Sequence, residues 1–154
     1  MYAPATKRGV MEEPLTEELL SELLGSANPQ TFLEQHPAQE RELATYLCEL
    51  LDERGLKRKD VVREAQLNET YGYQIFTGQR KHPSRDKILQ IAFAMSLDLR
   101  TTDRLLQAAG VSRLYCKDRR DAIIMFCIDR HASLTKVNET LFGLGELTLD
   151  GEIE

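Results

Sequence analysis

The chain has 154 residues, 42% of them hydrophobic, and a formal net charge of -5 at pH 7. This length fits one domain with an appendage, and the apolar fraction is enough for a packed core. No apolar stretch reaches the roughly 18 residues of a membrane span, and none follows the N-terminus as in a signal peptide, so we expect a cytoplasmic protein.

The N-terminal part of the chain is acidic and predicts two short helices. Residues 1–13 lack apolar periodicity and are expected to be a flexible lead. Within the acidic prefix, residues 14–37, we expect Thr16 to cap a helix that stops at Gly25. A second helix should start at Pro29, because proline is tolerated at the first helical position, and a His-Pro pair should end it.

Residues 38–110 have the apolar periodicity of five successive helices. The first has apolar side chains at offsets 0, 3, 4, 7 and 8, which form one helical face: Leu43, Tyr46, Leu47, Leu50 and Leu51. The predicted helices run from about residue 38 to Gly55, over 58–66, over 69–76, from Ser84 to about Met95, and over 101–109. Asn68 and Ser84 are expected N-caps, and Gly78 should close the third helix.

Residues 111–145 predict a C-terminal helical extension of two helices. They should span about 119–130 and 134–144, and Ser133 should cap the second. The first is almost continuously apolar from Ala122 to Ile128, so it is expected to be central to the fold or covered by a partner.

The remaining C-terminal features are minor. Tyr115 is expected to fill the junction between the fifth and sixth helices. Residues 146–154 form an acidic tail, in which Glu146-Leu147-Thr148-Leu149 is the one short alternation that hints at a strand. We therefore predict an all-α protein.

The cysteines and histidines are too scattered to indicate disulfides, redox chemistry or a metal site. Cys48 and Cys127 lie in apolar helical patterns and are expected to be buried. The sequence has no pairing of a nucleophile with a base and no phosphate-binding glycine loop. We therefore expect no catalytic residue, no metal and no cofactor, and a protein that is not an enzyme.

The distribution of charge is more informative than its sum. Residues 1–40 hold two basic and seven acidic residues, whereas residues 57–87 hold eight basic and four acidic residues. A local excess of positive charge is the electrostatic pattern of a nucleic-acid-binding surface. In residues 113–121, by contrast, acids lie beside the bases, and we expect an ion-paired surface loop there.

Residues 54–97 read RGLKRKDVVREAQLNETYGYQIFTGQRKHPSRDKILQIAFAMSL. The order is Gly-Leu, a second helix, a tight turn, a recognition helix, a glycine, a loop with basic residues, proline and serine, and an apolar fourth helix. Because of this order of elements, residues 41–106 resemble the lambda-repressor-like helix-turn-helix family, also called the Cro or xenobiotic-response-element type. The resemblance implies a five-helix helix-turn-helix domain, here with two acidic helices before it and two helices after it.

The resemblance also implies which residues meet DNA. In the family the recognition helix lies in the major groove, and the matching base-facing residues are Glu69, Thr70, Tyr73 and Gln74. The residues expected at phosphates are Arg58, Asn68, Arg80, Lys81 and Arg85. Gln74 fits bidentate pairing with adenine, and Glu69 fits the amino group of cytosine.

Two further side chains of this helix have expected positions. Ile75 should point into the core. Gly72 replaces the bulky apolar residue usual in the family, and we expect Tyr71, itself half-buried, to fill the space.

The resemblance predicts a sequence-specific DNA-binding transcriptional regulator whose partner is double-stranded DNA. A homodimer would double the DNA contacts, and the expected dimer or partner surface contains Ile124, Ile128, Leu141 and Phe142. The plainer alternative is that these side chains cover the five-helix core. The alternative function is an adaptor or antitoxin-like protein. It would bind a partner protein through the Tyr71-Gly72-Tyr73 surface, the acidic prefix or the C-terminal helices.

Overall fold

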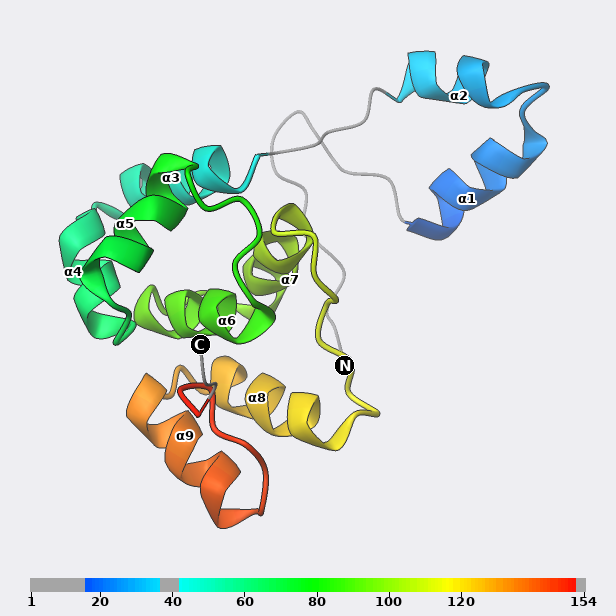
Figure 1. Cartoon of the computed structure of the whole chain (residues 1–154). Helices are drawn as coiled ribbons and strands as arrows, with labels where there is room; N and C mark the ends of the chain where they lie inside the picture. Colours follow the sequence, from blue (N-terminus) through cyan, green and yellow to red (C-terminus); the bar gives the residue numbers. More distant parts are fainter. Residues whose placement is uncertain (1–15, 37–41, 152–154) are drawn as a thin grey trace. The chain divides into compact units, whose positions relative to one another are not determined.

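The computed structural model describes residues 16–36 and 42–151, and within these ranges the chain is all-helical, with no strand. It divides into two compact units, Met1–Gln39 and Glu40–Glu154, here called the N-terminal and C-terminal units (Figure 1). The predicted lead and the ends of the predicted prefix and tail lie outside the described residues. None of the helices in the described ranges combines the length and apolar character needed to cross a bilayer.

The N-terminal unit is a helical hairpin of α1 (Thr16–Gly25) and α2 (Pro29–Gln35). The predicted start of α2 is confirmed, because the side chain of Asn28 accepts a hydrogen bond from the backbone N–H of Thr31. His36 ends α2, and its Nε2 lies 2.8 Å from Oε2 of Glu22, which ties the two helices together.

Within residues 42–151, the C-terminal unit contains seven helices in the order that the apolar periodicity predicts. They are α3 (Leu43–Arg54), α4 (Arg58–Glu64), α5 (Glu69–Thr77), α6 (Arg85–Ala94), α7 (Leu99–Ala108), α8 (Arg119–Asp129) and α9 (Leu134–Gly143). The start of α7 is two residues earlier than predicted, because Asp98 caps it by accepting from the N–H of Thr101. The start predicted for α3 at about residue 38 lies outside the described residues.

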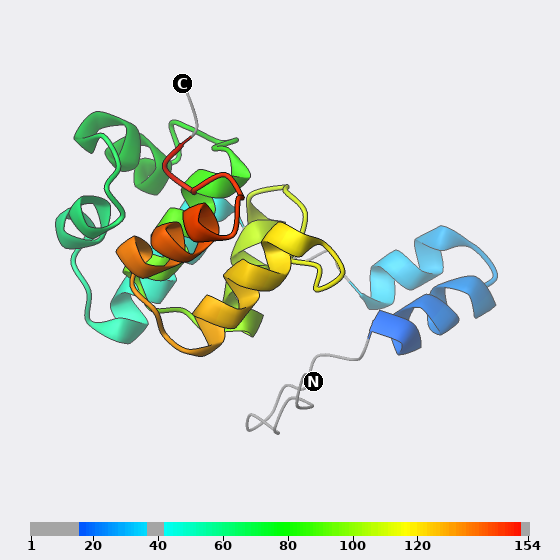
Figure 2. The ribbon, with the colours of Figure 1, turned by 90° about the horizontal axis from the view of Figure 1, so that it is seen from below.

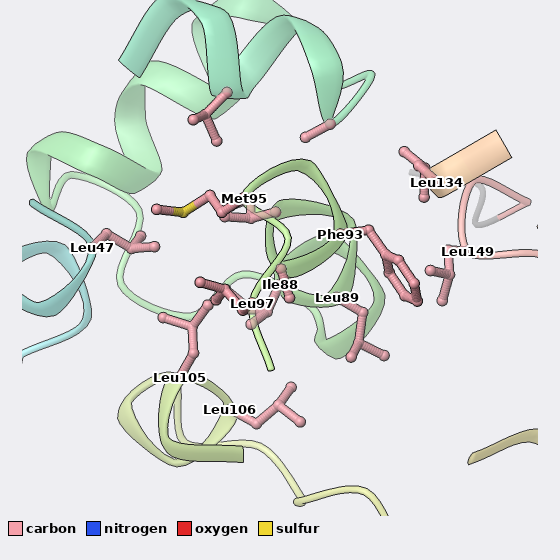
Figure 3. Close-up of a cluster of buried hydrophobic side chains, with 14 of the residues drawn as sticks. Leu47, Ile88, Leu89, Phe93, Met95, Leu97, Leu105, Leu106, Leu134 and Leu149 are labelled. Carbon is pink, nitrogen blue, oxygen red and sulfur yellow. The ribbon is translucent and has the colours of Figure 1, made fainter. Parts of the chain in front are cut away.

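The core is built around α6, whose residues from Ile88 to Phe93 are all buried. This helix packs against α4 and α7 and also against α9, so polar and apolar positions alike lose contact with solvent. Figure 3 shows Leu47 of α3, Leu105 of α7 and Leu149 of the C-terminal segment converging on α6. The five apolar residues predicted on one face of α3 are all buried.

The C-terminal helices belong to this core. In Figures 1 and 2, α8 and α9 form a hairpin on the side of α6 away from α3. Ile124, Ile128 and Leu141 are buried inside the chain, with exposed fractions of 3% or less. The prediction of a dimer or partner surface is therefore wrong for these three residues, and the alternative that they cover the core applies. Phe142 remains exposed.

Three smaller predictions are wrong. Cys48 is exposed, since it lies beside the apolar face of α3 and not on it, whereas Cys127 is buried as expected. Tyr115 is exposed, and Leu114 occupies the junction instead. The segment Glu146–Leu149 is not a strand; it is a loop that inserts Leu149 into the core, where the N–H of Leu149 donates to Oδ1 of Asn138.

Candidate nucleic-acid interface

The turn between α4 and α5 sets the position of the candidate site. Gln66 has a left-handed backbone, with φ of 58°, and reverses the chain directly after α4. Asn68 then caps α5, since its Oδ1 accepts a hydrogen bond from the N–H of Tyr71. From α6, the buried side chain of Gln90 donates to the carbonyl oxygen of Ala65 at 2.9 Å, which anchors the turn to the core.

One face of α5 is buried against α3 and α4 and consists of Gly72, Ile75 and Phe76. A Cβ atom at Gly72 would lie 2.5 Å from Cγ1 of Val62 on α4, which is closer than carbon atoms can approach. Val62 fills the space beside Gly72, and the expectation that Tyr71 fills it is wrong. Glycine at this position therefore allows α4 and α5 to pack more closely than any larger residue would.

The opposite face of α5 is polar and faces solvent. Glu69, Thr70 and Tyr73 are exposed, with Tyr73 at 48%, and Gln74 is half-buried. The structure thus brings the four residues predicted to face bases onto one accessible helix face. Within the C-terminal unit, no other helix covers the side chain of Glu69, which is exposed.

Two arginines flank this face by stacking on tyrosine rings. The guanidinium of Arg58, at the start of α4, lies 4.3 Å from the ring centroid of Tyr73. On the other side, Arg80 lies 4.4 Å from the ring centroid of Tyr71 and donates from Nη2 to Oε1 of Gln74 at 3.1 Å. Planar guanidinium groups stack well on aromatic rings and keep their N–H groups at the edge, where other acceptors can bind.

Lys81 and Lys87 extend the positive charge beside Arg80. Lys81 is exposed in the loop after α5. Lys87 is half-buried, and its Nζ lies 5.9 Å from the ring centroid of Tyr71. Arg58, Arg80, Lys81 and Lys87 therefore form a cationic border around the polar face of α5, and we call this group the basic rim.

Arg85 does not belong to the basic rim, although the sequence predicted a phosphate contact. It forms a bidentate ion pair with Asp121 of α8, with N···O distances of 2.8 and 2.7 Å, and it also donates to the carbonyl oxygens of Ser112 and Arg113. The hydrogen bond with Asp121 raises the pKa of Arg85. Its donors are therefore used inside the protein.

Asn68 likewise acts within the protein, because its Oδ1 is the cap acceptor of α5. Three features of the site were not predicted from the sequence. They are the stacking of two arginines on the tyrosine rings, the position of Lys87 near Tyr71, and the hydrogen bond from Gln90 to Ala65. The spacing of the two tyrosines on one helix gives a weak signal, but the pairing of Tyr73 with Arg58 joins residues 15 positions apart in the sequence and depends on packing.

Comparison of the chain with protein-family models, curated proteins and solved structures gave no match.

Proposed function

We propose that the protein is a sequence-specific DNA-binding transcriptional regulator that reads the major groove with α5. In this proposal α3 to α7 are the five-helix domain implied by the sequence resemblance, and α4 and α5 are its helix-turn-helix. The observation that carries the proposal is the exposed polar face of α5 bordered by the basic rim. Such an arrangement suits a helix inserted in a groove, because cations then face the two phosphate strands.

The α5 face offers donors and acceptors for base edges. Arg80 occupies one acceptor site on Oε1 of Gln74, and the second acceptor site and the two N–H donors of the amide remain for pairing with adenine. Glu69 accepts from the amino group of cytosine. Arg80 fixes the rotamer of Gln74, so a single side chain contributes both to phosphate binding and to the orientation of a base-reading group.

The position of charge explains how a reading helix can contain a glutamate. α5 itself has Glu69 and no basic residue, while the basic rim comes from α4, from the loop after α5 and from α6. Phosphate contacts supply most of the affinity and base contacts supply discrimination. In this protein the two tasks lie on different elements, so the acidic group weakens phosphate attraction only locally.

An adaptor that binds a partner through Tyr71-Gly72-Tyr73 is less consistent with the geometry. Gly72 is buried and Tyr71 is half-buried with Arg80 stacked on its ring. Only Tyr73 of the three presents an exposed ring. A surface that buries its central residue offers little apolar area to a partner protein.

The test is a fluorescence titration of the full chain with duplexes from the region upstream of its own gene, at two salt concentrations. We expect one duplex to bind far more tightly than the others. The double variant Arg80→Ala, Lys81→Ala should lose about 100-fold in affinity, because each charged hydrogen bond contributes about 1.5 kcal/mol or more. The slope of the logarithm of the binding constant against the logarithm of salt concentration should become shallower by about two, because about two fewer counterions are released on binding.

A matched control removes the same charge elsewhere. Arg130 and Lys136 are exposed on the α8–α9 hairpin, and Arg130→Ala, Lys136→Ala should leave affinity within about threefold of the unmodified chain. Weak binding that is indifferent to sequence, or equal losses in both double variants, would show that the proposed function is wrong.

A further inference from the structure

The N-terminal unit exposes apolar side chains that its own two helices do not cover. Across residues 17–36 no side chain is buried. Leu20, Leu23 and Leu24 of α1 are 53%, 37% and 75% exposed, and Leu33 of α2 is 54% exposed. A gathering of large exposed apolar residues on one small element is typical of an interaction surface, whereas single exposed leucines are ordinary.

The leucines of α1 form one stripe. At 100° per residue, positions 19, 20, 23 and 24 fall within an arc of about 140°. Leu19 is the member of this stripe nearest to Glu22. This edge of the stripe faces α2, because Glu22 contacts His36 and Leu19 is half-buried. Leu20 and Leu24 lie away from that edge and are the more exposed members. Glu17 borders the stripe on the open side.

The charge of the hairpin is of one sign. Residues 16–36 contain Glu17, Glu18, Glu22 and Glu34 and no lysine or arginine. A second identical hairpin seated on the stripe would bring glutamates against glutamates, which opposes association. A helix with an apolar stripe and flanking lysines or arginines would instead bury the leucines and pair with the acidic border.

We propose that α1 and α2 form a docking surface for a basic amphipathic helix of a partner protein. The leucine stripe contacts the apolar face of that helix, and Glu17, at the border of the stripe, attracts its basic flank. This docking surface belongs to the N-terminal unit alone, so peptide binding tests it independently of DNA binding by α5.

The probe is a labelled synthetic peptide of about 18 residues, long enough to form an amphipathic helix, with leucines on one face and lysines on the other. A second peptide carries glutamate in place of every lysine. Fluorescence anisotropy with the full chain should show binding of the lysine peptide and not of the glutamate peptide. Binding should weaken as salt is raised.

Two pairs of variants locate the binding. Leu20→Gln with Leu24→Gln should weaken binding of the lysine peptide at least tenfold, because two leucine side chains lose their apolar contact with the peptide. Glutamine preserves helix propensity, and circular dichroism should confirm that helix content is unchanged. The control is Leu147→Gln, because Leu147 is as exposed as Leu24, at 75%, but lies in the C-terminal unit. This control should bind like the unmodified chain.

The charge contribution is tested in the same way. Glu17→Gln should weaken binding and flatten its salt dependence, while Glu53→Gln, at an exposed position on α3, should change neither. Three results would overturn the proposal: equal binding of both peptides, equal losses in test and control variants, or self-association in analytical ultracentrifugation that Leu20→Gln with Leu24→Gln abolishes. The last result would identify a second copy of the chain as the occupant.

Discussion

The basic rim and the contact between α6 and α8 use arginine in two different ways. In the rim, Arg58 and Arg80 are exposed and stack on tyrosines. Between α6 and α8, Arg85 pairs with Asp121, and Arg120 forms a second bidentate pair with Asp86 at 3.0 and 3.1 Å. The first set keeps its charge available to solvent, and the second set neutralises it inside the protein.

The α6–α8 pairs hold the C-terminal segment on the core. Each arginine also donates to loop carbonyl oxygens, Arg85 to Ser112 and Arg113, and Arg120 to Leu147 and Thr148. Arg119 adds a bond to the carbonyl of Leu144 and an ion pair with Glu146. Arg119 and Arg120 form ion pairs as predicted, but the prediction of a loop paired with neighbouring acids is wrong, because both residues lie at the start of α8 and their partners, Glu146 and Asp86, come from other segments. A count of bases therefore overstates the positive charge that faces solvent.

The largest expected effect is on the free energy of unfolding, and it should distinguish the two sets of arginines. Arg85→Met leaves Asp121, which is 6% exposed, without its cation, and the free energy of unfolding should fall by about 3 kcal/mol. Arg58→Met should change it by no more than about 0.5 kcal/mol. Urea denaturation monitored by circular dichroism measures both. Equal losses would mean that the two arginines do not differ in structural role.

The close packing of α5 against α4 should give the next largest effect on the free energy of unfolding. Gly72→Ala places a Cβ 2.5 Å from Val62, so the free energy of unfolding should fall by about 2 kcal/mol from overpacking, although alanine is the better helix former by about 1 kcal/mol. In a Val62→Ala background the same change should cost less, because the opposing methyl groups are gone. Failure of Val62→Ala to reduce the cost in a denaturation double-mutant cycle would contradict the close contact of α4 with α5.

The stacked pairs of the rim should contribute little to folding. A double-mutant cycle with Arg58→Met and Tyr73→Leu should give a coupling energy of about 0.5 kcal/mol, as expected for an exposed cation over an aromatic ring. The same cycle at Arg85 and Asp121 should give a coupling several times larger. A strong coupling at Tyr73 would indicate that the rim, too, is a structural contact.

The smallest effect concerns Asp103 of α7, near Arg85. Burial raises the pKa of Asp103, while a hydrogen bond from the N–H of Leu114 opposes the shift. Because its pKa is higher in the folded than in the unfolded state, the folded chain holds more protons between those two values, and stability falls as pH rises through that window.

Asp103→Asn keeps an acceptor for Leu114 and removes the charge. Its melting temperature should exceed that of the unmodified chain by about 2 °C at pH 7. The difference should shrink as pH falls through that window and disappear near pH 3, about one unit below the ordinary pKa of 3.8, where the aspartic acid is protonated in both states. Thermal denaturation at several pH values tests this, and a constant difference at all pH values would contradict the role of ionisation.

The sequence by itself determined the helices and the polar face of α5. Helix ends depend on hydrogen bonds between residues three positions apart, such as Asn68 with Tyr71 and Ser84 with Lys87, and both partners can be read from the printed order. Helix faces follow from the 3.6-residue period, which is equally local. These features were therefore predictable without coordinates.

Only the tertiary structure decided how individual side chains are used. Arg85 and Arg80 have the same side chain in the same basic segment, yet Asp121, 36 positions away, neutralises one and Tyr71 stacks beneath the other. The contact of Gly72 with Val62 and the burial of Ile124 also depend on how whole helices pack. Such contacts join distant segments, and no local spacing specifies which of several chemically equivalent partners will meet.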